Sequence, residues 1–146
     1  MAHKPEMNQV ELHPYLAQPS LLEFANQNQI HLTAYSPLGS IGRPEGMKAE
    51  NEQALLEDTT VLAIATRLSI TPAQVLLAWA LQRGTAAIPK SVNPERLAQN
   101  FAAASITLDE ATMSELATLD AHRRYVKGDF WAKPGSPYTV ATLWDE

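Results

Sequence analysis

The sequence contains no cysteine. Disulfide bonds, cysteine metal ligands and thiol nucleophiles are therefore excluded, and the absence fits a cytoplasmic chain. Basic residues are also few: 11 Lys and Arg stand against 16 Asp and Glu, for a formal net charge of −5. We expect no nucleic-acid and no anionic-membrane partner, since both require a basic surface. No apolar run approaches the roughly 20 residues of a membrane-spanning helix, and residues 1–7 lack the apolar core of a secretory signal.

The sequence does contain enough apolar material for one folded domain. Its 146 residues are 45% hydrophobic and 18% charged, as in ordinary globular proteins. Strand and helix patterns alternate three times along the chain. The predicted strands end at Val10 and cover 30–35 and 85–88, and the predicted helices cover 19–26, 61–68, 71–83 and 93–101, with one more starting at Asp109. This order indicates α/β units around a parallel sheet, and both a doubly wound sheet and a (β/α)8 barrel fit it.

Local signals mark several helix ends. Thr71 to Gln74 has the sequence of a capping box with proline at the first helical position. Gly84 predicts a left-handed helix end, and Asn93 and Asp109 predict N-caps. Two segments lack a regular period. The polar stretch 41–58 is too long for a plain connector and is predicted to be a functional loop, while 123–146 is predicted to be a loop-like tail with interleaved aromatic residues.

Three segments together resemble the aldo-keto reductases. They are Asn8–Tyr15, Ala34–Ser40 and Ile88–Phe101, and the third is the most specific. The resemblance runs from about Lys4 to the C-terminus. It implies an α/β fold that is a partial (β/α)8 TIM barrel, comprising the last three βα units plus a C-terminal helix and tail. Residues 1–146 would then be the C-terminal part of an NADP-dependent oxidoreductase domain. On this expectation, the sequence begins in the middle of the barrel.

The resemblance also implies NADPH as cofactor and a set of residues that bind it. Gln9 resembles the glutamine that binds the nicotinamide carboxamide, and Tyr35 resembles the tyrosine that stacks on the nicotinamide ring. A cluster of charged and polar residues at a helix start suits the adenosine 2′-phosphate and favours NADP over NAD. The other implied contacts are Ser36, Leu38 and Ser40 with the pyrophosphate, Lys90, Ser91, Asn93 and Arg96 with the 2′-phosphate, Gln99 and Asn100 with the adenine edge, and Ile88 beside them.

Each of these residues also has a purely structural interpretation. Tyr35 would be a core tyrosine, the residues from Lys90 to Arg96 a solvated helix start, and Gln99 and Asn100 a polar helix face. For Gln99 the two interpretations are evenly balanced. Trp131 and Trp144 lie in the tail 123–146, which resembles the family's substrate loop, and they either line the pocket or anchor the tail.

No catalytic residue is predicted in this chain. The family's catalytic tyrosine, lysine, aspartate and histidine lie on earlier strands of the barrel. His13 belongs to a family motif but does not match the catalytic histidine, and the other histidines lack spaced partners for a metal site. No metal is therefore expected.

Three hypotheses follow for function. The first is the reduction of a small aldehyde or ketone by an NADPH-dependent reductase to which this chain contributes cofactor contacts, the chain being inactive alone. The second is a non-catalytic nucleotide-binding or interaction module that associates through open sheet edges. In the third, a separate N-terminal half or a second copy closes the barrel. An open parallel sheet predicts poor stability for the isolated chain.

Overall fold

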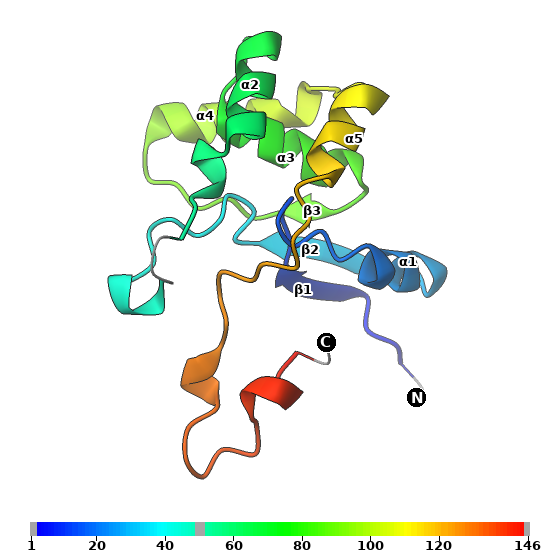
Figure 1. The fold of residues 1–146 in the computed structure, drawn as a ribbon. Helices are drawn as coiled ribbons and strands as arrows, with labels where there is room; N and C mark the ends of the chain where they lie inside the picture. Colours follow the sequence, from blue (N-terminus) through cyan, green and yellow to red (C-terminus); the bar gives the residue numbers. More distant parts are fainter. Residues whose placement is uncertain (1–2, 49–51, 145–146) are drawn as a thin grey trace.

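A computed structural model describes residues 3–48 and 52–144 and contains a three-stranded parallel sheet (Figure 1). The strands are β1 (Met7–Glu11), β2 (His31–Tyr35) and β3 (Ala86–Ala87), in that order across the sheet. Met7 pairs with His31 and Glu11 with Tyr35, while Ala34 pairs with Ala87. The predicted α/β class and parallel sheet are confirmed, and the carboxyl ends of the strands share one edge of the sheet.

Five α-helices connect and cover these strands in the described part of the chain. In Figure 1, α2 to α5 gather on one side of the sheet, α1 lies beside the strands, and residues beyond about 126 extend away on the other side. The helices are α1 (Pro19–Gln27), α2 (Thr59–Leu68), α3 (Pro72–Gln82), α4 (Pro94–Ala102) and α5 (Glu110–Ala117). The short 3-10 turns are η1 (Glu45–Met47), η2 (Leu55–Glu57), η3 (Ala103–Ser105), η4 (Asp129–Trp131) and η5 (Val140–Thr142).

The helix ends follow the local signals in the sequence. Thr71 and Gln74 form the predicted capping box at the start of α3. The side chain of Asn93 accepts a hydrogen bond from the backbone N–H of Arg96, and that of Asp109 accepts one from Thr112. Gly84 follows α3 with a φ of +83°, a conformation that glycine adopts without strain. The predicted N-caps and the predicted helix end are therefore confirmed.

The hydrophobic core lies between the helices and one face of the sheet. Successive strand residues point to opposite faces, so Leu12, Leu32 and Ala34 face the core and are at most 2% exposed. Residues 75–80 of α3 are all buried, with Trp79 at the centre, and α2 adds Val61, Ile64 and Ala65. The opposite face of the sheet carries the alternate residues, among them Gln9, Thr33 and Tyr35, and is more polar.

Two predicted segments differ from the structure. The strand expected over 85–88 is limited to Ala86–Ala87. Both the backbone N–H and the hydroxyl of Thr85 donate to the Ala80 carbonyl of α3, at 3.3 and 2.7 Å, and Pro89 has no N–H to continue the ladder. The stretch 41–58 is not simply a polar loop, because Leu55 is 1% exposed and packs in the core. Residues 49–51 of that stretch lie outside the described residues.

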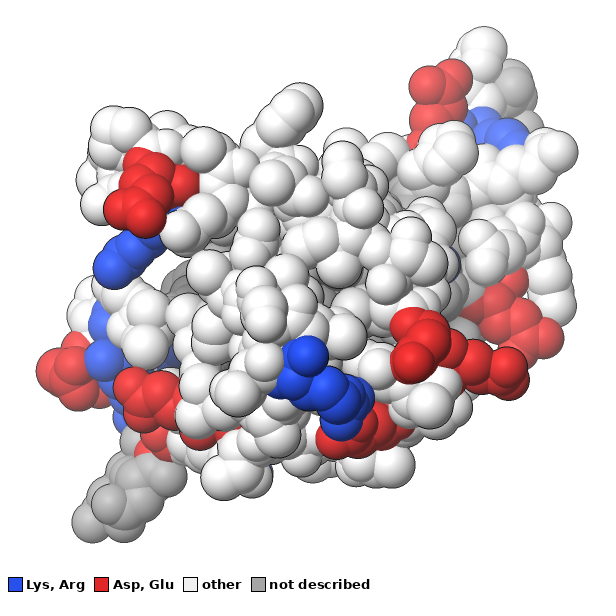
Figure 2. Space-filling model, turned by 90° about the horizontal axis from the view of Figure 1, so that it is seen from above, with Lys and Arg blue, Asp and Glu red and all other residues white. Residues whose placement is uncertain are grey.

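None of the described helices alone is long and apolar enough to cross a membrane, and only α2 and α3 taken together, bent by 92°, match in length and composition. The α3 part of that pair is the buried core helix. Figure 2 views the molecule from the side of these helices. On that face Lys and Arg are scattered among Asp and Glu, with no continuous basic patch.

Candidate functional site

The carboxyl ends of the three strands bring several predicted site residues to one edge of the sheet. Tyr35 is the last residue of β2 and pairs with Glu11, the last residue of β1. The Ile88 amide donates to the Ala34 carbonyl at 3.1 Å, so the third chain segment continues alongside β2 after β3 ends. Gln9 is exposed and pairs with Thr33, two residues before the edge. Tyr35 and Ile88 therefore meet at the edge, while Gln9 lies further along the same sheet face.

Tyr35 is half-buried and remains an uncharged phenol at neutral pH. Burial raises the pKa of Tyr35, and the negative charge of Glu11 raises it further. Arg124 has the opposite effect on this pKa through its positive charge and a side-chain hydrogen bond, but the net direction is upward. A neutral aromatic ring at a strand end can stack on a flat ligand ring.

The turn after β2 holds its backbone in an unusual conformation. Ser36, Gly39 and Ser40 have positive φ angles of 49°, 82° and 52°. A Cβ on Gly39 would lie 3.0 Å from the Leu55 Cβ and 3.1 Å from the Tyr125 ring, so only glycine fits without a shift. The side chain of Arg43 stabilises the turn by donating to the carbonyls of Gly39 and Ser40 at 3.2 and 3.0 Å.

The predicted pyrophosphate residues in this turn differ in what they can offer a ligand. In the described part of the chain, neither the Ser36 hydroxyl nor the Ser40 hydroxyl has a hydrogen-bond partner, and both residues are half-buried. Leu38 packs against the core. The two serines can therefore present hydroxyls to an anion, whereas Leu38 can contribute only its backbone.

At the start of α4 two predicted ligands are already engaged within the turn. The Asn93 side chain caps the helix through Arg96 N–H at 3.0 Å, and the Ser91 hydroxyl accepts from the Asn93 N–H at 3.1 Å. Lys90 and Arg96 are exposed, and neither takes part in an ion pair with any described residue. Two cations without an acidic partner at a helix N-terminus suit a phosphate group.

Further along α4, Gln99 and Asn100 are half-buried. The Gln99 side chain donates to Glu95 at 3.3 Å, one turn earlier, and the Gln99 backbone carbonyl accepts from the Gln74 side chain of α3 at 3.2 Å. The structural interpretation of Gln99 as a polar helix residue therefore has contacts to support it. Asn100 lies four residues after Arg96 and so shares its side of the helix.

Comparison with known proteins places this chain in a family. The family model described as "Aldo/keto reductase family" matches residues 2–121. The chain is an aldo-keto reductase family member. It is 60% identical over 142 residues to an aldo/keto reductase of Synechocystis, which covers 97% of this chain and 43% of that protein. The NAD(P)H-dependent D-xylose reductase of Candida tenuis is 45% identical, over 94% of this chain and 42% of the reductase.

The rabbit aldo-keto reductase family 1 member D1 is 40% identical over 90% of this chain and 40% of its own length. This aldo-keto reductase chain thus spans about two fifths of the length of the curated relatives that it matches. The resemblance of Asn8–Tyr15, Ala34–Ser40 and Ile88–Phe101 to this family is confirmed.

The sequence did not reveal a buried polar cluster beside Tyr35. Glu11 and His13 are both 0% exposed, and the Glu11 Oε1 lies 2.9 Å from the His13 Nε2. Burial alone would raise the pKa of Glu11. Hydrogen bonds from His13 and from the amides of Tyr125 and Val126 outweigh burial, and the net effect lowers the pKa below its ordinary value of 4.5. The sequence signal that could have indicated this cluster is Glu11 itself, which stands between Val10 and Leu12 at the end of the predicted strand.

Acidification is expected to release the tail before the core of this aldo-keto reductase chain unfolds. A carboxyl whose folded pKa is depressed stabilises the fold above its unfolded pKa, and this contribution is lost as pH falls through the folded pKa. For Glu11 that range lies below 4.5. His13 is the titratable side chain that lowers the pKa of Glu11, and Glu11 in turn raises the pKa of Tyr35.

The measurement is circular dichroism during acid titration. The near-ultraviolet signal, to which Tyr125 and Trp144 contribute, is expected to fall at higher pH than the far-ultraviolet helix signal. In the Glu11→Gln variant this early step should vanish. Coincident loss of both signals in the wild-type chain would contradict the prediction.

Proposed function

We propose that residues 1–146 form the C-terminal part of a (β/α)8 barrel domain, with β1, β2 and β3 as its last three strands. The parallel order β1-β2-β3 and the helices on one sheet face fit a barrel wall. The polar sheet face would then point into the barrel. Residues 123–146 would be the tail that borders the substrate pocket. Near the start of this tail, Tyr125 and Val126 hydrogen-bond to Glu11 at the carboxyl end of β1. Barrel enzymes bind their ligands at the carboxyl ends of the strands.

We propose that this part of the barrel binds NADPH. The observation that carries the proposal is the placement of a neutral, half-buried Tyr35 at the strand ends, with Lys90 and Arg96 following the neighbouring strand and forming no ion pair with any described residue. Tyr35 would stack on the nicotinamide, Gln9 would bind its carboxamide, and Ser36, Leu38 and Ser40 would line the pyrophosphate. Lys90, Ser91, Asn93 and Arg96 would hold the 2′-phosphate, with Ile88, Gln99 and Asn100 beside the adenosine.

Contacts within the chain favour some of these proposed roles over others. The side chains of Ser91 and Asn93 shape the turn, so Lys90 and Arg96 are proposed to provide most of the phosphate contact. Leu38 would act through its backbone N–H, because its side chain packs against the core. Bound NADPH supplies the hydride, and the protein would fix its position and exclude water from it.

We propose that the whole reductase reduces a small aldehyde or ketone to an alcohol. Its catalytic tyrosine, lysine, aspartate and histidine would come from the part of the barrel corresponding to the unmatched regions of the relatives. This chain is proposed to supply cofactor contacts and none of the catalytic groups. On the alternative hypothesis, the chain is a nucleotide-binding or interaction module without catalysis.

The test is a chimera. The 146-residue chain would replace the matched region of the Synechocystis relative, with which it shares 60% identity. We expect the chimera to oxidise NADPH in the presence of 4-nitrobenzaldehyde with saturation kinetics, as the intact relative would under the same conditions. The isolated chain is the control and should show no turnover, because it lacks a proton donor positioned at the carbonyl.

Each outcome separates the hypotheses. A chimera that folds but neither binds NADPH nor consumes it would overturn the proposed function. Saturable NADPH binding by the isolated chain, followed through tryptophan and cofactor fluorescence with NADH as control, would favour the binding module if the chimera were inactive.

A further inference from the structure

Glu11 places a negative charge in the interior of the domain. It ends β1, is 0% exposed, and lies next to Leu12, which is also fully buried. Removing a carboxylate from water is unfavourable by several kcal/mol unless hydrogen bonds replace the lost hydration. A buried carboxylate in a small domain therefore needs a full set of donors, and the identity of those donors indicates what it holds in place.

Three donors surround this carboxylate, and two of them come from the far end of the chain. The Tyr125 amide donates to Oε1 at 2.6 Å and the Val126 amide donates to Oε2 at 2.9 Å. The third donor is the His13 Nε2 at 2.9 Å from Oε1. The His13 Nδ1 has no hydrogen-bond partner in the described part of the chain, so Nε2 is the ring nitrogen that His13 uses to contact Glu11.

The segment held by Glu11 is the root of the tail, residues 123–126, and its residues contact several parts of the chain besides β1. The Arg123 amide donates to the Tyr15 carbonyl at 2.8 Å. The Tyr125 ring is 1% exposed, lies 5.0 Å from the His13 ring, and its hydroxyl donates to the Gln53 carbonyl at 2.8 Å. This root therefore ties the end of β1 to the segment before α2.

Arg124 connects the root to the end of the tail. Its guanidinium lies 4.0 Å from the Trp144 ring, and its positive charge acts on Tyr35, whose pKa it lowers. The Trp144 indole in turn donates to the Lys127 carbonyl at 2.8 Å, which folds the tail back on its own root. Because Arg124 directly precedes the two amides that Glu11 holds, its position depends on theirs.

We propose that Glu11 is a positioning residue: its buried carboxylate, oriented by His13, clamps the main chain of Tyr125 and Val126 to the end of β1 and so fixes the position of the tail, whose Arg124 and Trp144 contact each other. The clamp itself follows from the contacts within this chain. Its effect on substrate binding rests on the proposed function, in which Tyr35 contacts the nicotinamide and the tail borders the substrate pocket.

The chemistry of the clamp requires a carboxylate. An ionised glutamate presents only acceptors, so both oxygens can receive N–H groups. The Glu11→Gln variant has nearly the same size but turns an NH2 group toward one of the three donors. It also removes the charge that strengthens the remaining hydrogen bonds. A purely space-filling role would tolerate this change, whereas a clamp would not. Glu57→Gln is the matched control, because Glu57 is exposed.

The first experiment is hydrogen exchange of the chain followed by mass spectrometry. Peptides covering 124–127 are expected to exchange roughly 10-fold or more faster in Glu11→Gln than in Glu57→Gln, since a hydrogen bond to a charged group contributes about 1.5–3 kcal/mol. The exchange rate of peptides covering β2 should differ by less than about twofold between the two variants. Equal exchange of 124–127 in both variants, or equal acceleration of β2, would overturn the clamp.

The second experiment uses the chimera and tests the link to the site. Glu11→Gln is expected to raise the KM for the aldehyde several-fold more than it changes the Kd for NADPH, because the tail rather than the cofactor loses its fixed position. An unchanged KM with faster exchange of 124–127 would overturn the link to substrate. If Glu11→Gln accelerates hydrogen exchange of residues 124–127 but the chimera made with the unmutated chain has no activity, the clamp is supported and the proposed function is rejected.

Discussion

The purified chain is expected to associate in solution, and the double variant Val92→Ser/Phe101→Ser is expected to shift it toward monomers. Val92 and Phe101 are 81% and 85% exposed, the highest values among the large apolar side chains of the described residues. Leu97 lies between them on α4 and is 48% exposed. Large apolar groups gathered on one surface commonly mark a site that another protein segment covers.

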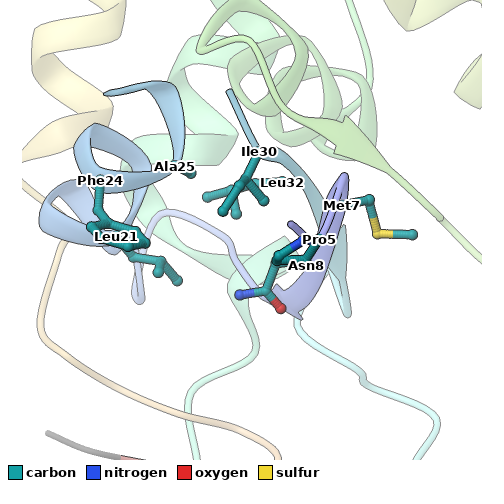
Figure 3. Close-up of a pocket in the computed structure, with 8 residues that line it drawn as sticks. All are labelled: Pro5, Met7, Asn8, Leu21, Phe24, Ala25, Ile30 and Leu32. Atoms are coloured by element: carbon teal, nitrogen blue, oxygen red, sulfur yellow. The ribbon is translucent and has the colours of Figure 1, made fainter. Parts of the chain in front are cut away.

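A second apolar surface lies beside β1 and α1. A cavity of about 310 Å³ opens between β1, α1 and β2, lined by side chains from all three elements (Figure 3). Among its lining residues, Met7 and Phe24 are 51% and 56% exposed. No described strand pairs with the outer edge of β1 or of β3. Parallel sheets are normally covered on both faces and paired at their edges, so these surfaces favour association with a further chain segment or a second copy.

Light scattering and sedimentation across a range of concentrations measure this association. Burying one phenylalanine side chain contributes about 1.5–3 kcal/mol, so its loss should weaken association roughly 10- to 150-fold. Leu62→Ser is the matched control, because Leu62 is 41% exposed but lies on α2. A cooperative unfolding transition of a monomer, independent of concentration, would contradict the prediction.

Local signals in the sequence predicted those parts of the fold that depend on neighbouring residues. Thr71 with Gln74, Gly84, Asn93 and Asp109 mark helix ends through hydrogen bonds or backbone angles within a few positions, and all of them lie where expected. The parallel sheet was predictable because alternating strands and helices leave few other arrangements. The full extent of the strand 85–88 was not, because the Thr85 backbone N–H donates to the Ala80 carbonyl of α3 instead of to a strand.

The family resemblance predicts the candidate site as a set of residues, but the sequence did not predict the network of contacts around them. Family resemblance identified Tyr35, Lys90 and Arg96, and the structure places Tyr35 at a strand end and both cations without an ionic partner among the described residues. The contacts of Glu11 with Tyr125 and Val126 join positions 114 and 115 residues apart. No local pattern encodes such a contact, and the tail was therefore predicted as loop-like although Tyr125 is part of the core.

Replacing Arg96 with alanine is expected to weaken NADPH binding roughly 10- to 150-fold and to leave NADH binding nearly unchanged. The two cofactors differ only in the 2′-phosphate, and a charge-assisted hydrogen bond to that phosphate contributes about 1.5–3 kcal/mol. Lys90→Ala should act in the same direction with a smaller effect, because an ammonium offers no planar pair of donors. The measurement is a fluorescence titration of the chimera, or of the isolated chain if it binds, with each cofactor.

The titration with NADH shows whether Arg96 contacts the 2′-phosphate or mainly supports the fold. The backbone N–H of Arg96 donates to the Asn93 cap, and alanine retains that N–H, so α4 should still begin at Pro94. If Arg96 served mainly to support the fold, both cofactors would lose affinity together. Lys133→Ala removes an exposed charge of the tail and controls for net charge. Equal affinity for NADPH and NADH in the wild-type protein, with no change in Arg96→Ala, would mean that these cations do not bind the 2′-phosphate.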